Sequence, residues 1–305
     1  MMNESDALSV FDGMRTESPA SIENYKTVVR RFIKHHPDVY EVTTDEIAQY
    51  LEDMLNDGYA DKTVDAARTG LIKFFGQLDR DDDPTDSDKL DIWSWYQYTG
   101  KTRKTEKKEI IYLEQDEINK LIENLPAPVL RNELIVRLMF ETGLRATELC
   151  TLKVEDIDTD NRRIDVIGGK GNKDRTVYYD ETLDTLLEIW LVDRQGVYVD
   201  NTPYLFPTNR SEHISQRRLA DVINKGAEKA GIQETLYVDK SGKGRKRVTP
   251  HTIRHSFAMA CLNNGMPIKF LQELMGHDRM ETTEVYLNAL DTDVEKSYRR
   301  WGPQY

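Results

Sequence analysis

Cysteine and long apolar segments are both scarce in this sequence. Of its 305 residues only two are cysteine, Cys150 and Cys261, and neither fits a disulfide framework or a zinc-binding spacing. No apolar run approaches the roughly 18 residues that a membrane-spanning helix needs. The first ten residues lack the basic-then-apolar order of a secretory signal. We therefore expect a cytoplasmic protein without a membrane partner, in which both cysteines are small buried side chains.

Two segments resemble ligand-binding loops but lack essential residues. Residues 81–86 are acidic, yet the glycine and the terminal glutamate of a calcium loop are missing. Residues 168–171 read Gly-Gly-Lys-Gly, without the Lys-Ser/Thr pair and the helix that complete a P-loop. The sequence also offers no carboxylate cluster of the kind that two-metal enzymes use. We expect neither a cofactor nor a metal ion.

Helical periodicity predominates, with one exception. Apolar side chains recur at helical spacing in three or four segments between residues 18 and 78, and in several segments after residue 110. The exception is an alternating pattern at 163–167 and 175–179 around a glycine-rich turn, which predicts a β-hairpin. We expect a mainly α protein with a small β-sheet (α+β). Its parts would be a helical domain at 1–80, a charged linker at 81–108 and a second domain at 109–305.

A helix with one polar face is predicted to begin at residue 250. Thr249 is a favourable N-cap and Pro250 suits the first helical position. Basic and imidazole side chains follow at i, i+3 and i+4, so they share a face: His251, Arg254 and His255. An apolar stripe runs along the same helix and includes Ile253, Phe257, Ala260 and Cys261.

Two further short helices are predicted between this helix and a tyrosine. The first ends at Gly276, directly before His277. The second, capped by Thr282 or Thr283, carries Tyr286. Histidine, arginine and tyrosine side chains would thus gather at helix ends, where they could reach a buried anion.

Arg145 follows the end of another predicted helix. Gly143 terminates that helix and turns the chain so that Arg145 projects. Apolar residues on either side would anchor the backbone: Leu144, Leu149 and Leu152. By itself Arg145 could be an ordinary surface arginine, but a guanidinium held in this way can bind a phosphate through two hydrogen bonds.

Together these residues resemble the tyrosine recombinase family of integrase and Xer type. The resemblance is carried by the Gly-Leu-Arg-Ala-Thr-Glu-Leu sequence at 143–149 and by the order and spacing of the residues from 251 to 286. It covers nearly the whole chain, firmly from about residue 111 to residue 286. It implies a small helical core-binding domain, which clamps DNA, followed by a catalytic domain.

The resemblance implies six catalytic residues. Tyr286 would attack a backbone phosphorus and form a 3′-phosphotyrosyl bond, releasing a 5′-hydroxyl. Arg145 and Arg254 would stabilise the charge that grows on the phosphate, and His277 would donate a hydrogen bond to it. His251 would assist Tyr286 as a hydrogen-bond partner or as a general base.

A lysine and a glutamate complete the implied site. Lys170, at the tip of the predicted hairpin, would protonate the departing 5′-oxygen. Lys173 is the local rival for that role, and we place it on a DNA phosphate instead. Glu148 resembles the acidic residue that orients the site in this family, although it could equally be a solvated helix residue.

The net charge of −12 is unusual for a protein that binds nucleic acid. Basic residues nevertheless cluster at 101–108, 162–175 and 240–247, and the last of these segments is predicted to be a loop. At molar salt the Debye length is only about 3 Å, so a dispersed negative surface repels DNA little. We interpret the chain as a double-stranded-DNA-binding protein of a halophile, although composition alone would favour an acidic protein without a DNA partner. Candidate DNA contacts are Lys101, Arg103, Lys104, Lys173, Lys243 and Arg245, of which the first three could instead belong to a solvated tether.

Two other functions share parts of this pattern. A type IB topoisomerase would use the same tyrosine chemistry without strand exchange, and a regulator would bind DNA without cleaving it. The helical N-terminal domain and the second histidine favour recombination over relaxation, and the filled catalytic positions disfavour a regulator. The apolar tail at 287–305 could pack on its own domain, but the resemblance implies that it docks into a neighbouring protomer. We therefore expect a homo-oligomer, from dimer to tetramer, on DNA.

Overall fold

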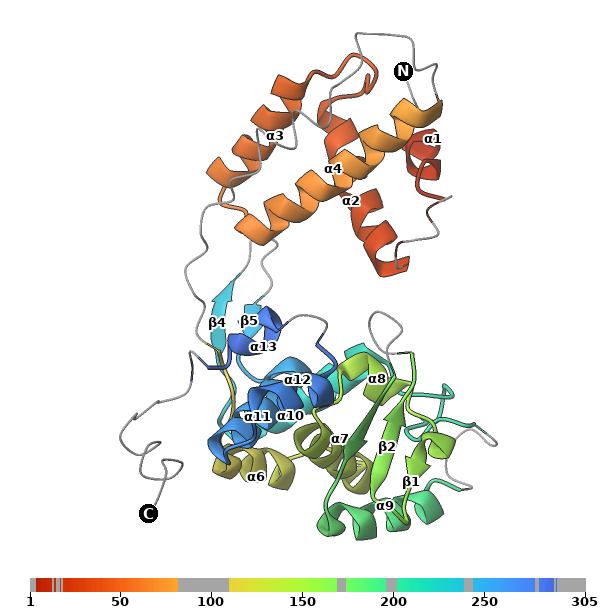
Figure 1. Ribbon diagram of the computed structural model, residues 1–305, viewed down its shortest axis with the longest axis vertical. Helices are drawn as coiled ribbons and strands as arrows, with labels where there is room; N and C mark the ends of the chain where they lie inside the picture. Colours follow the sequence, from red (N-terminus) through yellow and green to blue (C-terminus); the bar gives the residue numbers. More distant parts are fainter. Residues whose placement is uncertain are drawn as a thin grey trace, which may run out of the picture. The chain divides into compact units, whose positions relative to one another are not determined.

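Figure 1 shows a computed structural model of the protein. It describes residues 4–12, 14, 17, 19–81, 110–168, 174–195, 202–238, 244–277, 280–287 and 289. The chain divides into two compact units, Met1–Lys108 and Glu109–Tyr305, and each is described by itself. Within the described ranges, no helix is both long enough and apolar enough to cross a membrane.

The first unit is helical in its described part. Its helices are α1 (Glu4–Ser9), α2 (Pro19–His35), α3 (Thr44–Asn56) and α4 (Asp61–Asp81). The last three confirm the helical segments predicted from the sequence, whereas α1 was not anticipated. Helix α2 packs against α4, and their apolar faces enclose a core that includes Phe11, Val29, Phe32, Ile47, Leu71 and Phe74. Thr43 begins α3 with a capping box, in which the Thr43 hydroxyl and the Glu46 carboxylate bond each other's backbone N–H groups.

The second unit surrounds one central helix. Its helices are α6 (Gln115–Glu123), α7 (Val129–Thr142), α8 (Ala146–Cys150), α9 (Glu181–Asp193), α10 (Gln216–Lys229), α11 (Pro250–Asn263), α12 (Ile268–Met275) and α13 (Glu281–Glu284), with a 3-10 turn at Val154–Asp156. Helix α7 packs against both α9 and α11, which explains why five of its apolar side chains are fully buried. Its carboxyl end is therefore fixed within the core, and this end leads into the candidate site.

A three-stranded antiparallel sheet lies beside these helices (Figure 1). It consists of β1 (Ile157–Asp158), β2 (Arg163–Val166) and β3 (Arg175–Tyr178), in that order. Ile164 pairs with Val177 and both are fully buried, so the predicted hairpin and its inward face are confirmed. The fold class predicted from the sequence, mainly α with a small sheet, is likewise confirmed.

The basic segment 240–247 differs from the loop that the sequence predicted. Residues Gly244–Lys246 form β5, which pairs antiparallel with β4 (Thr235–Val238). Arg247, directly after β5, forms an ion pair with Glu117 of α6 at 2.7 Å. Part of the basic charge in this segment therefore holds the fold together and is not free to contact DNA.

Candidate active site

The turn between α7 and α8 places Arg145. Gly143 ends α7 with a left-handed backbone (φ 64°) and donates its N–H to the Met139 carbonyl. A Cβ on this glycine would lie 2.3 Å from Cδ1 of Phe257 on α11, so only glycine allows α7 and α11 to approach this closely. Arg145 then caps α8, and the predicted anchors Leu144 and Leu149 are fully buried.

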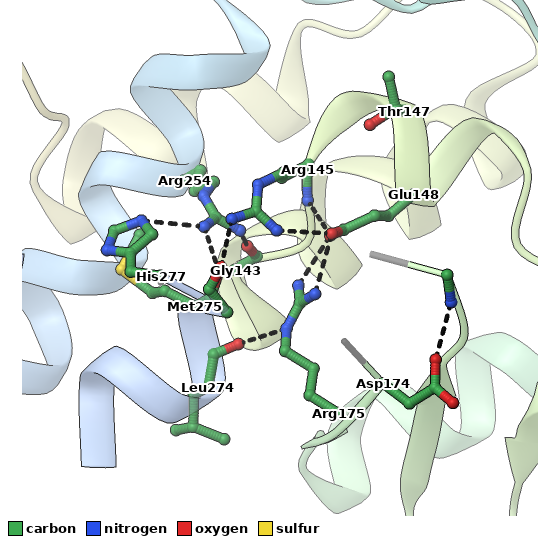
Figure 2. Close-up of polar contacts among 12 residues, drawn as sticks. Gly143, Arg145, Thr147, Glu148, Asp174, Arg175, Arg254, Leu274, Met275 and His277 are labelled. Atoms are coloured by element: carbon green, nitrogen blue, oxygen red, sulfur yellow. Dashed lines mark hydrogen bonds and ion pairs between the residues drawn. The ribbon is translucent and has the colours of Figure 1, made fainter. Parts of the chain in front are cut away.

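The Glu148 side chain is buried between two arginines. The alternative prediction, that Glu148 is a solvated helix residue, is therefore wrong. Its carboxylate accepts hydrogen bonds from Arg145 Nη1 at 2.8 Å and from the Arg145 backbone N–H at 2.7 Å (Figure 2). Arg175 binds it through both Nη1, at 2.9 Å, and Nη2, at 2.7 Å. Burial raises the pKa of Glu148, but the bonds and charges of Arg175 and Arg145 outweigh it and lower this pKa to about 2.

Arg254 and Arg145 hold the turn at the end of α12. Arg254 is 3% exposed and donates hydrogen bonds to the carbonyls of Gly143 and Met275 (Figure 2). Arg145 Nη2 donates to the Gly276 carbonyl at 2.6 Å. Burial lowers the pKa of Arg254 to about 10, so its guanidinium remains charged at neutral pH. The two cations therefore converge on one turn, where a phosphate could meet both.

His277 lies directly after that turn, as predicted, and its ring is held by contacts on two sides. Its Nε2 lies 3.2 Å from Arg254 Nη2, and its Nδ1 lies 2.9 Å from the Thr283 hydroxyl. Because arginine only donates, Nε2 accepts and Nδ1 carries the proton of the neutral ring. Burial, followed by the charge of Arg254, lowers the pKa of His277 to about 4, so the ring is neutral at pH 7.

The prediction that Thr282 or Thr283 caps α13 is wrong. The N-cap of this helix is Met280, and both threonines lie inside it. The Thr283 side chain is fully buried, and its hydroxyl faces the ring of His277. Thr283 thus holds a histidine in place and does not begin the helix.

Tyr286 lies just after α13 and is only 2% exposed. It belongs to a small apolar cluster with Phe257, Leu271 and Met275. Its hydroxyl lies 2.8 Å from Nδ1 of His255. Burial raises the pKa of Tyr286 to about 12, although the charge of Arg254 opposes the rise. The phenol is therefore protonated at neutral pH in this arrangement.

His255, and not His251 as predicted, lies beside the tyrosine hydroxyl. Both rings project from α11, and their centroids lie 4.1 Å apart in an edge-on contact. His251 is exposed, whereas His255 is half-buried between His251 and Tyr286. Burial, reinforced by the charges of His251, Arg254 and His277, lowers the pKa of His255 to about 3. His255 is thus a neutral ring in direct contact with the tyrosine oxygen.

Several predicted residues lie outside the described part of the chain. They are Lys170 at the hairpin tip and the candidate DNA contacts Lys101, Arg103, Lys104, Lys173 and Lys243. Arg245 is described: its exposed guanidinium donates from Nε to the Tyr237 hydroxyl at 3.1 Å across the β4–β5 pair.

Two residues of the site, Arg175 and His255, were not assigned a role from the sequence. Each nevertheless has a sequence feature that indicates a role. Arg175 falls two residues before the buried Val177 of β3, so it faces inward, and a charged residue at an inward strand position needs a buried partner. His255 shares the polar face of α11 with His251. The sequence did not show which of these two histidines Tyr286 would approach.

Comparison with known proteins identifies the family. Residues 112–293 match the phage integrase family, and residues 9–83 match the phage integrase N-terminal SAM-like domain. The chain belongs to the phage integrase family. Among named members, tyrosine recombinase XerA of Pyrococcus horikoshii is 33% identical over 287 residues, covering 93% of this chain and 88% of that relative. XerA of Pyrococcus furiosus is 37% identical over 191 residues, which cover 62% of this chain and 60% of that relative.

Solved structures of this family have the same fold. A crystal structure of XerA recombinase is 28% identical and covers 99% of this chain and 100% of its own, with a TM-score of 0.53. XerH recombinase bound to a palindromic difH substrate covers 99% of this chain and 86% of its own at a TM-score of 0.74. At 21% identity, that second likeness shows the fold alone.

Proposed function

We propose that this phage integrase family member is a site-specific DNA recombinase that cleaves and rejoins strands through a 3′-phosphotyrosyl intermediate. The observation that carries the proposal is the convergence of Arg145, Arg254 and His277 on one turn, with Tyr286 on the adjoining helix end. Relatives that cover most of this chain are named tyrosine recombinases, which supports the same reaction.

The chemistry follows from the charges at that turn. Tyr286 Oη attacks phosphorus, the bond from phosphorus to the 5′-oxygen breaks, and the phosphoryl group stays on the tyrosine as a 3′-phosphotyrosyl ester. Arg145 and Arg254 are already oriented by backbone carbonyls, so their remaining N–H groups can bind the nonbridging oxygens with little reorganisation. The bond energy is retained in the ester. The 5′-hydroxyl of another strand can then attack this ester, which joins the two strands and releases Tyr286.

The other assignments come from the family resemblance. Lys170 would protonate the departing 5′-oxygen, and His251 would assist Tyr286 as a hydrogen-bond partner or as a general base. Glu148 would act through Arg145, because it fixes both the side chain and the backbone of that arginine. We further propose that residues 1–80 clamp the DNA, that 81–108 link the two domains and that 109–305 carry out catalysis.

The proposed partner is double-stranded DNA containing a specific site. XerH is described as bound to a difH substrate, and λ integrase as a dimer bound to a core site. By likeness to these proteins, we propose that this chain assembles as a homo-oligomer on DNA. The residues proposed to contact its phosphates are Lys101, Arg103, Lys104, Lys173, Lys243 and Arg245. The dispersed acidic charge and the two free cysteines, Cys150 and Cys261, support a cytoplasm of high salt as its environment.

Replacement of Tyr286 by phenylalanine tests the proposal. The variant should bind DNA as the wild type does and form no covalent complex, because only the nucleophilic oxygen is removed. The substrate is a plasmid with two copies of the recombination site, and denaturing gels detect protein-linked DNA while restriction digests detect exchanged strands. A covalent complex in the variant would assign the nucleophile to another residue. Relaxation of the plasmid by the wild type without exchange would favour the topoisomerase alternative.

A further inference from the structure

We propose that Arg175 is a positioning residue for DNA cleavage, which sets Arg145 in place through the carboxylate that both arginines share. This inference rests on the proposed function and adds a residue that acts behind the phosphate-binding arginines. Arg175 lies on β3, and its guanidinium contacts Glu148 of α8 and the end of α12 (Figure 2).

All three guanidinium nitrogens of Arg175 donate to other parts of the unit. Nη1 and Nη2 donate to the two carboxylate oxygens of Glu148, at 2.9 and 2.7 Å, and Nε donates to the Leu274 carbonyl at 2.7 Å. The Arg175 side chain is only 8% exposed. Because this guanidinium is directed at protein groups and not at DNA, its effect on the reaction must pass through its neighbours.

Through Glu148, Arg175 limits how Arg145 can pair. The Arg145 guanidinium donates to Glu148 Oε1 through Nη1 alone, at 2.8 Å, while its Nη2 donates to the Gly276 carbonyl at 2.6 Å. A free carboxylate would favour a two-bond pair with an arginine, but Arg175 already takes up both oxygens of this one. Arg145 therefore keeps N–H groups, and more of its charge, for a nonbridging phosphate oxygen.

The bond to Leu274 steadies the turn that the catalytic residues share. Leu274 lies in the last turn of α12, and the two carbonyls that follow it receive the two catalytic arginines. A Cβ on Gly276 would lie 3.1 Å from Cδ of Arg175, so this side chain packs directly against the turn. One residue of the sheet thus supports the turn that His277 directly follows.

Lysine at this position would lose the geometry while keeping the charge. Its ammonium group is a point charge and not a planar fork, so it cannot hold both Glu148 oxygens and the Leu274 carbonyl at once. With one carboxylate oxygen released, Glu148 would turn towards Arg145 and draw that guanidinium away from the phosphate. Misplacement of a catalytic group by about 1 Å can slow a reaction about 10²-fold.

Arg175→Lys tests the proposal on a nicked duplex that carries the recombination site of the plasmid assay. A nick close to the cleaved phosphate releases a short strand, so the covalent complex accumulates and its formation is followed on denaturing gels. The rate constant at saturating DNA should fall about 10²-fold, while the half-saturating DNA concentration stays within about threefold of the wild type. A loss of folded protein would lower the amount of complex but not this rate constant.

A double variant shows whether Arg175 acts through Arg145. Added to Arg145→Lys, Arg175→Lys should slow the reaction by less than about threefold more, because the residue through which it acts is already impaired. Two independent defects would multiply. Arg163→Lys, on the neighbouring strand β2, is the matched control. The Arg163 side chain is 46% exposed and pairs with Asp158 at 3.0 Å, so its replacement should change neither the rate nor the half-saturating concentration.

A second variant serves if Arg175→Lys is poorly folded in thermal unfolding. Glu148→Asp shortens the link by one methylene from its other end, so it cannot reach both arginines as Glu148 does. It should show the same loss of rate at saturating DNA and the same failure to multiply with Arg145→Lys.

The outcomes separate this inference from the proposed function. Cleavage by Arg175→Lys at the wild-type rate would overturn the inference, and so would a loss that multiplies with that of Arg145→Lys. A raised half-saturating concentration with an unchanged maximal rate would overturn it too, because Arg175 would then contribute to DNA binding. If the wild type forms no covalent complex, or if Tyr286→Phe still forms one, the proposed function fails, whatever the Arg175 variants do.

Discussion

Replacement of Glu148 by glutamine should destabilise the catalytic unit far more than loss of a surface ion pair. The Glu148 and Arg175 side chains are each only 8% exposed, and Arg145 completes the network. A carboxyl with a pKa of about 2 in the folded protein, against an ordinary value of 4.5, contributes about 3 kcal/mol at neutral pH. Loss of one partner from a buried ion pair costs a similar amount, about 3–5 kcal/mol.

This loss can be measured by calorimetry on wild type and Glu148→Gln. For a unit of this size, about 3 kcal/mol corresponds to a decrease in Tm of roughly 6–12 °C. Glu133→Gln is the matched control. Glu133 binds Arg137 at the same 2.8 Å that separates Glu148 from Arg145, but the Glu133 and Arg137 side chains are both more exposed than those of the Glu148–Arg145 pair. This surface pair should contribute less than about 1 kcal/mol.

The pH dependence of the same difference gives a second check. Because folding lowers the pKa of Glu148, its stabilising effect is fully present above pH 4.5 and is lost as the pH falls towards about 2. The Tm difference between wild type and Glu148→Gln should therefore stay constant from pH 7 to pH 5 and shrink below pH 4.5. A Glu148→Gln variant that melts no lower than Glu133→Gln would refute the reasoning, because the carboxylate would then not hold the arginines.

Three other predictions follow from the site and its surroundings. Gly143→Ala should cost about 2–4 kcal/mol in denaturant unfolding, because it adds a clash with Phe257 to a left-handed backbone. Gly231→Ala, with a similar φ and open space around its Cβ, should cost only about 1 kcal/mol, and equal losses would contradict the steric argument. DNA cleavage should persist in EDTA, since Arg145 and Arg254 supply the positive charge. A loss of cleavage in EDTA that magnesium restores would contradict this metal-free scheme. Truncation after Asp291 should spare binding to one half-site in gel-shift assays but weaken assembly on a full site; cooperative assembly by the truncated protein would show that the tail packs on its own domain.

Features set by neighbouring residues in the chain could be predicted from the sequence. Thr249 caps α11 through its hydroxyl, and Gly276 ends α12 in a left-handed conformation, because both signals act within one helical turn. The β2–β3 hairpin was predictable because alternation of polar and apolar residues is also a local property. These local features placed Arg145, Arg254 and His277 at helix ends before any tertiary contact was known.

Contacts between distant segments could not be predicted in the same way. His255 and Tyr286 are 31 positions apart, and which histidine meets the tyrosine depends on where the segment after α13 approaches α11. The capping preference of threonine suggested a helix start at residue 282 or 283, but the bond between Thr283 and His277 needs the hydroxyl inside α13. Strand β5 lacks apolar alternation altogether, so its basic residues suggested a loop, although it pairs with β4.

Three guanidinium groups stand close together at this site, and the carbonyls that receive them explain how the fold tolerates their repulsion. Arg254 binds carbonyls at the carboxyl ends of α7 and α12, and Arg145 and Arg175 bind carbonyls around the same end of α12. Helix carboxyl ends carry partial negative charge, so the two helix ends and the carboxylate of Glu148 together neutralise part of the positive charge of the three arginines. One full and two partial negative charges cannot cancel three full positive ones, so the site retains an excess of positive potential. That excess faces the place where an attacked phosphodiester gains negative charge, so the helix ends set how strongly the transition state is favoured over the resting DNA.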